Sequence, residues 1–370
     1  MPLVDEMPEL IPQLTLYITE IGREAGEAPE LSMRPKADLA DIRAWRYYRA
    51  SPTEFFYQYA RDFYFDHVHV AFDALSEAVK LLADHVVFSL VVAGHVGAQR
   101  LEKLKTACAA RGIVLILKRL PASRALTGDD SGLRWRKTPD EALAEAGISP
   151  QTTLTQPALY WSAWFNRFYA DEVLPVLRVR DAGIFFGFMK ALSEVTAQGL
   201  NWAGLGKRCG ISGPSARDWS RFLEDAGVID LVAPQRAQPP RRAKLRPKLY
   251  WNAPGLALWL SDAVSGCTPA MHRALFENAV YLAEKDRCPE STFAHFLDTN
   301  AVRAPLMRKE AGGAATAYYF PDSLESFELA LKHHASLERA RLASGAARIV
   351  TEGPSPFPMK GDVSSLPVLL

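Results

Sequence analysis

RDFYFDHVHVAF, residues 61–72, is the stretch from which the fold of this chain can be predicted. FYFDHV has the apolar composition of a short buried strand, and FDALSEAVKLLADH, which follows it, places its apolar residues at helical spacing. VVFSLVVAG predicts a second strand, VGAQRLEKLKTACAARG a second helix, and IVLILKRL a third strand. Strands that alternate with helices in this way predict an α/β fold with a parallel sheet.

Polar residues follow two of these strands at the point where each strand ends. Asp66 and His67 close the first strand, and Gly94 and His95 close the second. Ligands of such sheets bind beyond the carboxyl ends of the strands, because the loops there take no part in core packing and helix N-termini point inward. We therefore expect Asp66, His67 and His95 at the functional edge of the sheet. An equally simple interpretation makes Asp66 a structural carboxylate held by backbone N–H groups.

Length and composition limit the class of protein. A chain of 370 residues with 48% hydrophobic and 23% charged residues has the composition of a globular protein with two or three domains. No window approaches the roughly 18 apolar residues of a membrane span, and the start of the chain is acidic, unlike a signal peptide. We expect a cytoplasmic protein without a membrane partner. Four scattered cysteines favour neither a disulfide framework nor a zinc ribbon.

Charge is unevenly distributed along the chain although the net charge is only +1. Residues 1–30 carry seven acids and one base. Residues 235–248, QRAQPPRRAKLRPK, which we call the basic segment, carry six bases and no acid: Arg236, Arg241, Arg242, Lys244, Arg246 and Lys248. The basic segment is therefore expected to attract phosphate groups.

The residues before the basic segment have a helical pattern. IFFGFMKALSEVTAQG, NWAGLGKRCG and GPSARDWSRFLEDAG predict three helices, and VIDLVAP and KLYWN predict strands on either side of the basic segment. In the third helix an apolar face opposes Arg217 and Arg221. Three helices and a basic hairpin predict a winged helix-turn-helix, whose third helix and wing would contact duplex DNA. Winged helices also dock proteins, and acids in the third helix offset its two arginines.

Several motifs occur in the order that one family shows. The motifs are DLADIRAWRYYRASPTEFF, the strands that end at Asp66 and Gly94, LPASRAL after the third strand, RPKLYWNAPGLALWL and LFENAV. In this order they resemble the bacterial AAA-type P-loop ATPases that carry a winged helix and a PD-(D/E)xK nuclease-like domain. The resemblance spans roughly residues 38–370. It implies a P-loop-NTPase-like core, a winged helix and an α/β nuclease-like C-terminal domain.

The chain differs from this family in the motifs that bind and hydrolyse ATP. No G-x-x-x-x-G-K-[ST] phosphate loop occurs, and IGREAGEAPE stands in its region. Asp66 matches the Walker B aspartate, but His67 replaces the adjacent glutamate and His95 replaces the sensor serine. The resemblance therefore implies a degenerate ATPase core. We expect no cofactor, with ATP and magnesium bound only if nucleotide binding is retained.

The nuclease-like domain departs from its family in the same way. Glu277 in LFENAV matches the helical acid of the nuclease motif, whereas NAVRAPLM and ATAYYFPDS stand where the other metal ligands would be. A metal site built from His67, His69, His85 and His95 lacks ligand-type spacing. We expect no metal.

These observations predict five segments: an acidic one (1–30), a degenerate ATPase core (31–128), a helical linker (129–183), a winged helix (184–262) and a degenerate nuclease-like domain (263–370). Two functions remain open. One is a non-catalytic protein that binds DNA or a partner, with Arg217, Arg221 and the basic segment on double-stranded DNA, or with a protein partner or a second copy of the chain. The other is an ATP-binding protein with an unconventional or partner-supplied phosphate loop.

Overall fold

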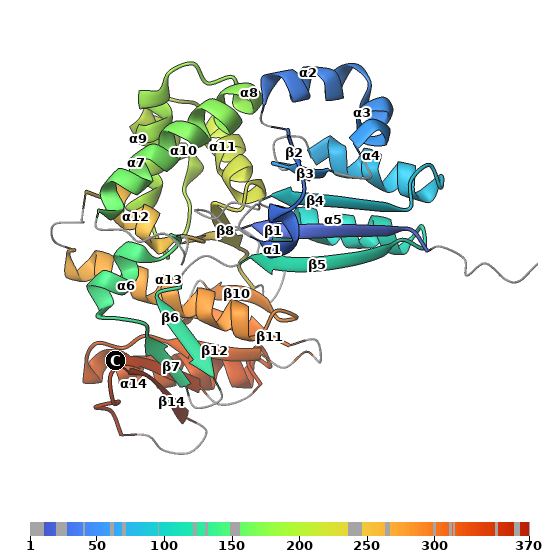
Figure 1. Ribbon diagram of the computed structural model, residues 1–370. Helices are drawn as coiled ribbons and strands as arrows, with labels where there is room; N and C mark the ends of the chain where they lie inside the picture. Colours follow the sequence, from blue (N-terminus) through green and yellow to red (C-terminus); the bar gives the residue numbers. More distant parts are fainter. Residues whose placement is uncertain are drawn as a thin grey trace, which may run out of the picture. The chain divides into compact units, whose positions relative to one another are not determined.

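A five-stranded parallel sheet and a seven-stranded mixed sheet organise the chain (Figure 1). The computed structural model describes residues 11–19, 28–39, 41–59, 63–68, 72–94, 96–120, 124–129, 132–148, 156–235, 246–262, 267–298, 301–310, 313, 315–344, 347–358 and 363–369. The chain divides into an N-terminal unit (1–122, 147–182 and 218–228) and a C-terminal unit (123–146, 183–217 and 229–370).

The sheet of the N-terminal unit has the strand order β2-β3-β4-β1-β5, and all of its pairings are parallel. Its strands are β1 (Gln13–Thr19), β2 (Lys36–Asp38), β3 (Tyr64–Asp66), β4 (Ser89–Gly94) and β5 (Val114–Leu120). The prediction of a parallel sheet is confirmed, and β3, β4 and β5 are the three strands expected from the sequence. The order differs from both common doubly wound arrangements, because β4 pairs with β1 as well as with β3.

Strand β1 occupies the second position from one edge, between β4 and β5, and sequence reasoning missed it. It lies within residues 1–30, for which sequence reasoning considered only the acidic charge. The strand itself, QLTLYIT, carries no charged residue, and Leu14 and Leu16 are fully buried. The β-branched and aromatic residues within it were the signal that could have identified it.

Helices cover both faces of this sheet. On one face α4 (Phe72–Ala83) and α5 (Ala98–Ala109) pack with α2 (Ile42–Ala50) and α3 (Pro52–Tyr59) around Phe65 and the leucines of β1. The other face carries α1 (Pro29–Ser32), whose Leu31 packs against Tyr17 and Val91. Both faces are apolar because a parallel sheet is buried on both sides.

A long aromatic helix completes the N-terminal unit. It runs through α7 (Pro157–Phe168), a π-helical turn (Tyr169–Val173) and α8 (Leu174–Leu177). Trp161 is fully buried, Trp164 stacks on Phe168 with ring centroids 4.8 Å apart, and Phe168 lies 6.0 Å from Phe222. These aromatic side chains therefore pack inside the N-terminal unit.

The sheet of the C-terminal unit has the order β10-β11-β12-β13-β14-β7-β6. Its strands are β6 (Leu126–Asp129), β7 (Gly132–Trp135), β10 (Thr292–Leu297), β11 (Arg303–Lys309), β12 (Ala315–Tyr319), β13 (Ala347–Glu352) and β14 (Val363–Leu369). Helix α14 (Leu324–Arg339) packs on one face. On the other face, Glu284 of α13 (Pro269–Arg287) accepts a hydrogen bond of 2.5 Å from Tyr318 of β12.

Strands β6 and β7 belong to this sheet although the sequence placed their region between a core and a helical linker. Val368 of β14 pairs with Leu133 of β7, and an antiparallel pairing then joins β7 to β6. Helix α6 (Pro139–Glu145) follows, with Thr138 at its N-cap position and a proline in its first turn. The pairing of β7 with β14 joins residues far apart in the sequence, and no local sequence pattern predicts it.

Three helices and a hairpin precede α13. They are α9 (Ala182–Ser193), α10 (Trp202–Cys209), α11 (Gly213–Asp225), and the antiparallel strands β8 (Ile229–Val232) and β9 (Lys248–Trp251), followed by α12 (Pro254–Leu260). These are the elements expected from the sequence, in the expected order. Residues 236–245, which connect β8 to β9 in the sequence, lie outside the described residues.

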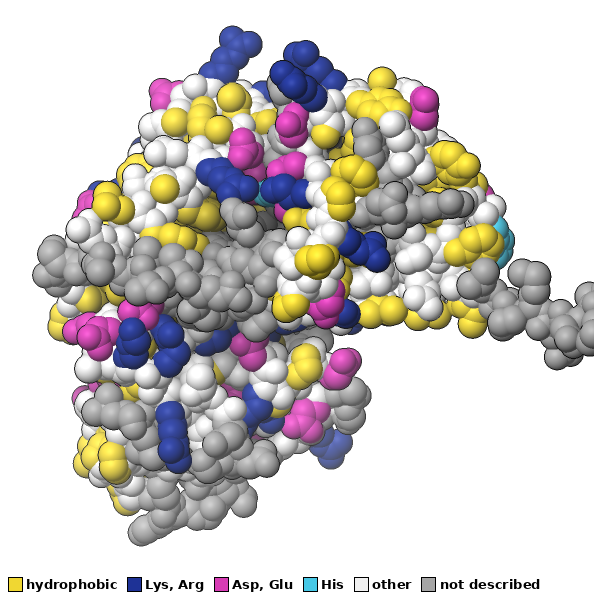
Figure 2. Space-filling view, viewed as in Figure 1, with side chains coloured by type: hydrophobic (Ala, Val, Ile, Leu, Met, Phe, Trp, Pro, Cys, Tyr) yellow, Lys and Arg dark blue, Asp and Glu magenta, His cyan; other side chains and the backbone are white. Residues whose placement is uncertain are grey.

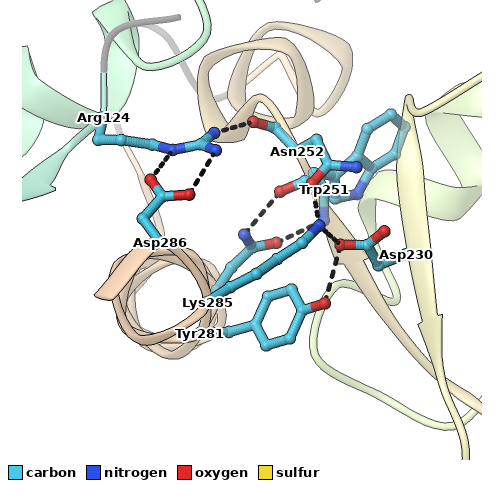
Figure 3. Close-up of polar contacts among 8 residues, drawn as sticks. Arg124, Asp230, Trp251, Asn252, Tyr281, Lys285 and Asp286 are labelled. Atoms are coloured by element: carbon cyan, nitrogen blue, oxygen red, sulfur yellow. Dashed lines mark hydrogen bonds and ion pairs between the residues drawn. The ribbon is translucent and has the colours of Figure 1, made fainter. Parts of the chain in front are cut away.

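Buried polar contacts tie the hairpin to α13 (Figure 3). The Lys285 ammonium donates to Asp230 of β8 over 2.5 Å, and the Tyr281 hydroxyl donates to the same carboxylate oxygen over 2.8 Å. Asn278 donates to and accepts from the backbone of Trp251. Burial raises the pKa of Asp230, but Lys285 and these hydrogen bonds outweigh it and hold the pKa below its usual value. Buried hydrogen bonds and an ion pair therefore hold helix α13 against the hairpin.

Among the described residues, no helix has the length and apolar composition needed to cross a bilayer.

Gly97 marks a close backbone approach inside the N-terminal unit. It is the N-cap residue of α5, and its N–H donates to the carbonyl of Asp225 at the end of α11 over 3.3 Å. A Cβ at this position would lie 2.3 Å from the carbonyl oxygen of Glu224, and backbone cannot yield as a side chain can. The Arg100 guanidinium adds an ion pair with Asp225 at 2.9 Å.

We predict that Gly97→Ala destabilises the protein by about 1–3 kcal/mol, because the added methyl group overpacks a backbone contact. Gly187→Ala is the matched control, since nothing lies within 4 Å of its Cβ and alanine favours the α9 helix. Urea denaturation followed by circular dichroism measures both. An unchanged midpoint for Gly97→Ala would show that α5 and α11 do not approach each other in this way.

Candidate functional site

Four charged residues meet at the carboxyl ends of β2 and β3. Asp38 and Asp66 end these neighbouring strands in register, and Lys36 lies on β2. His67 follows Asp66 with a left-handed backbone (φ 57°), and its N–H donates to Asp66 Oδ1 over 2.8 Å. The expected placement of Asp66 and His67 at the edge of the sheet is thus found in the structure.

The two carboxylates are matched by two cations. His67 Nδ1 lies 2.7 Å from Asp38 and 3.8 Å from Asp66, while Lys36 Nζ lies 3.1 Å and 3.9 Å from the same two groups. Burial lowers the pKa of His67, but Asp38 and Asp66 outweigh it and raise the pKa to about 9. Burial raises the pKa of Asp66, against the attraction of His67 and Lys36. At neutral pH an imidazolium therefore stands between the two acids.

Sequence reasoning found half of this cluster. Asp38 and Lys36 lie on a strand of three residues, too short to show an alternating pattern. His95, the expected sensor residue at the end of β4, lies outside the described residues.

A second charged pair lies in the C-terminal unit. The Lys248 ammonium of β9 contacts Glu277 of α13 and donates to the backbone carbonyl of Pro305 on β11 over 2.9 Å. The Tyr250 hydroxyl donates to the same Glu277 oxygen over 2.7 Å. Only 12% of the Lys248 and Glu277 side chains is exposed. Burial and Glu277 together raise the pKa of Tyr250 well above its usual value.

This pair changes the interpretation of two predicted site residues. Lys248 was expected to contact DNA phosphates, but its charge is neutralised inside the protein by Glu277. Glu277, the expected nuclease-like acid, faces this lysine and a tyrosine. Within the described residues, no group of three or more His, Cys, Asp or Glu side chains could hold a metal ion.

Helix α11 presents one apolar and one charged face, as predicted. Phe222, Leu223 and Ala226 are buried, whereas Arg217 and Arg221 are exposed. The Arg217 guanidinium lies over the Trp202 ring, 5.5 Å from its centroid. Neither arginine has an ion-pair partner in the part of the chain that the structure describes. Both charges are therefore available to an external anion.

The hairpin that follows α11 is anchored at its root. Gln235 N–H donates to the His295 carbonyl of β10 over 2.7 Å, and His295 Nε2 lies 3.0 Å from the Arg246 carbonyl. Arg246 is exposed, and Arg236, Arg241, Arg242 and Lys244 lie outside the described residues. Basic and acidic side chains are otherwise interspersed on the face that Figure 2 shows, which agrees with the net charge of +1.

One family model matches this part of the chain. A domain of unknown function (DUF8612) matches residues 150–265, which contain the aromatic helix, the three helices α9 to α11, the hairpin and α12. No curated protein matches the chain.

We predict that the N-terminal unit loses stability as pH rises from about 6.5 to 9. A folded-state pKa above the ordinary value of 6.5 means that the stabilisation is complete below pH 6.5 and is lost as pH rises through about 9. A rise in pKa from 6.5 to about 9 corresponds to about 3.5 kcal/mol, at about 1.4 kcal/mol for each pKa unit. Urea denaturation at several pH values measures it.

His67→Gln should flatten this pH dependence. His85→Gln is the matched control, because His85 has the same left-handed backbone in the same unit but an exposed side chain. If both variants keep the wild-type pH dependence, His67 is not the group that links stability to pH.

Proposed function

We propose that this chain is a non-catalytic DNA-binding protein, in which a winged helix contacts the duplex and the ATPase-like and nuclease-like parts serve as scaffolds. The observation that carries the proposal is the succession of α11, with Arg217 and Arg221 exposed, and the β8–β9 hairpin, whose two strands flank most of the basic segment in the sequence. This order of three helices and a hairpin supports a winged helix-turn-helix.

The way proteins contact DNA supports separate roles for the helix arginines and the basic segment. Arginines on phosphates supply affinity regardless of sequence, whereas side chains from a helix in the major groove supply sequence preference. Arg217 is suited to the second task, because its stacking on Trp202 limits the conformations of a long side chain. The basic segment is suited to the first, because it is dense in charge and contains no acid.

The cations that already contact Asp38, Asp66 and Glu277 support the absence of catalysis. Magnesium is bound by ionised carboxylates and water. Asp38 and Asp66 already face His67 and Lys36, and Glu277 already faces Lys248. A metal ion would have to displace His67 and Lys248, whose side chains are only 15% and 12% exposed, and leave them without their acidic partners, which is costly.

The alternative function is nucleotide binding through an unconventional or partner-supplied loop. A thermal shift with ATP and magnesium tests it, since any ligand that binds the folded state raises the melting temperature. A clear shift that Asp66→Ala abolishes would favour that alternative and contradict a purely scaffolding role for the N-terminal unit.

We predict different effects for the two arginine sets on duplex binding, measured by electrophoretic shift. Replacing Arg241, Arg242 and Lys244 with alanine should weaken binding to all sequences alike and flatten the slope of log affinity against log salt by up to about 2.7. Arg217→Gln with Arg221→Gln should mainly reduce any sequence preference.

The matched control removes three exposed charges elsewhere, in Lys80→Gln/Lys103→Gln/Arg111→Gln on α4, α5 and the turn after α5. It should leave both properties unchanged. Equal losses in the control and in the basic-segment variant would mean that net charge alone, and not the winged helix, determines binding.

A further inference from the structure

A cleft of about 860 Å³ lies in the C-terminal unit, at the root of the hairpin. Its walls come from β9, from α13, from β10 to β12 and from α14. The volume falls in the range of about 300–1,000 Å³ that is typical of small-molecule sites. Neither the winged-helix proposal nor the resemblance to nucleases uses this space as a site for a small ligand.

The negative and positive charges that line the cleft do not balance, because four Lys and Arg side chains face three acids. Two of its three acids are already paired, Glu277 with Lys248 and Asp322 with Arg273. The third acid, Asp298, accepts a hydrogen bond from the Val302 N–H over 2.9 Å.

Arg246 and Arg303 also line the cleft and are exposed, and the described residues offer neither of them an ion-pair partner. Guanidinium groups in this situation favour an oxyanion, which they can bind through two parallel hydrogen bonds.

Two histidines add neutral hydrogen-bonding groups. Burial and then Lys248 lower the pKa of His295, and burial and then Arg303 lower the pKa of His333, with Asp298 opposing. At neutral pH both rings are therefore uncharged. His295 already donates from Nε2 to the Arg246 carbonyl and so offers a ligand one acceptor, whereas His333 can offer one donor and one acceptor. Such groups suit a ligand with hydroxyl or ring-nitrogen atoms in addition to its charge.

The rest of the lining is largely apolar. Leu297 and Leu329 are exposed, and Phe320 and Pro321 also line the cleft. Apolar surface next to free guanidinium groups suits a ligand that combines a flat, weakly polar part with an anionic part.

We propose that this cleft binds a phosphate-bearing ligand of nucleotide size, with its phosphate on Arg246 and Arg303 and its base against the apolar wall. Arg246 joins this site to the hairpin, because it is the first described residue after the basic tip and its carbonyl contacts His295. The nucleotide can be free in solution or part of a single strand that the basic segment holds. Neither source requires α11 to bind a duplex.

A neighbouring cleft of about 820 Å³ does not compete for this ligand. It shares Arg273, Asp322 and Phe320 with the first cleft, but it is lined by Asp140 and Glu352. The only basic side chain that lines the second cleft and not the first is His272, which lies 3.6 Å from Glu352. The acids of the second cleft repel a phosphate.

Isothermal titration of the full chain with adenosine 5′-monophosphate, and with adenosine as the uncharged comparison, tests the proposal. The monophosphate should bind and adenosine should bind at least about tenfold more weakly, because a hydrogen bond to a charged group is lost. Arg246→Gln/Arg303→Gln should reduce the affinity for the monophosphate to that for adenosine.

The matched control is Lys332→Gln/Arg339→Gln, which removes two exposed charges from α14 outside the cleft and should bind as the wild type does. Circular dichroism establishes that both variants are folded. No binding of the monophosphate to wild type, or equal binding to wild type and to the folded Arg246/Arg303 variant, would overturn the proposal.

Titration with a short single-stranded oligonucleotide distinguishes the two sources. Binding that falls in both the Arg246/Arg303 variant and the basic-segment variant identifies a nucleotide within a strand, whereas monophosphate binding without strand binding identifies the free nucleotide. Duplex binding that persists when monophosphate binding is absent would overturn the cleft proposal alone and leave the winged-helix proposal standing.

Discussion

The C-terminal unit depends on one ammonium group held between an acid and a backbone carbonyl. Lys248 of β9 reaches Glu277 of α13 and the Pro305 carbonyl of β11, and so joins the hairpin, a helix and the sheet at one point. Tyr250 supports the same carboxylate from the same strand. Because a buried charge without a partner is strongly destabilising, these elements are constrained to move together. The constraint fixes the root of the hairpin and, beside it, the wall of the cleft.

The N-terminal unit shows the same physical arrangement with different residues. At the ends of β2 and β3, an imidazolium and an ammonium from the chain face two carboxylates, just as Lys248 faces Glu277. In each place a side chain supplies the positive charge that a metal ion would otherwise supply to such acids. This shared arrangement supports the proposal that these parts of the chain serve as a scaffold and that the exposed arginines contact a ligand.

The sequence predicted those features that depend on local periodicity. The helical repeat of α11 identified Arg217 and Arg221 as exposed and Phe222 as buried, and the alternation of strands and helices identified the parallel sheet. Pairings between distant residues were not predictable. Lys248 appears in sequence as one base of a charged run, and only the fold brings Glu277 to it from 29 positions further along the chain. Likewise β7 joins the sheet through β14 near the end of the chain, and β1 was obscured by the acids around it.

Salt dependence of duplex binding by the wild-type chain tests the central claim most directly. If about four charges of the proposed winged helix meet phosphates, log affinity should fall against log salt with a slope near −3.6. The account predicts measurable affinity at low salt with this slope and weak binding at physiological salt, with no cleavage of the DNA. The absence of duplex affinity even near about 50 mM salt, where counterion release favours binding most, would contradict it and would favour a protein-docking role for the proposed winged helix.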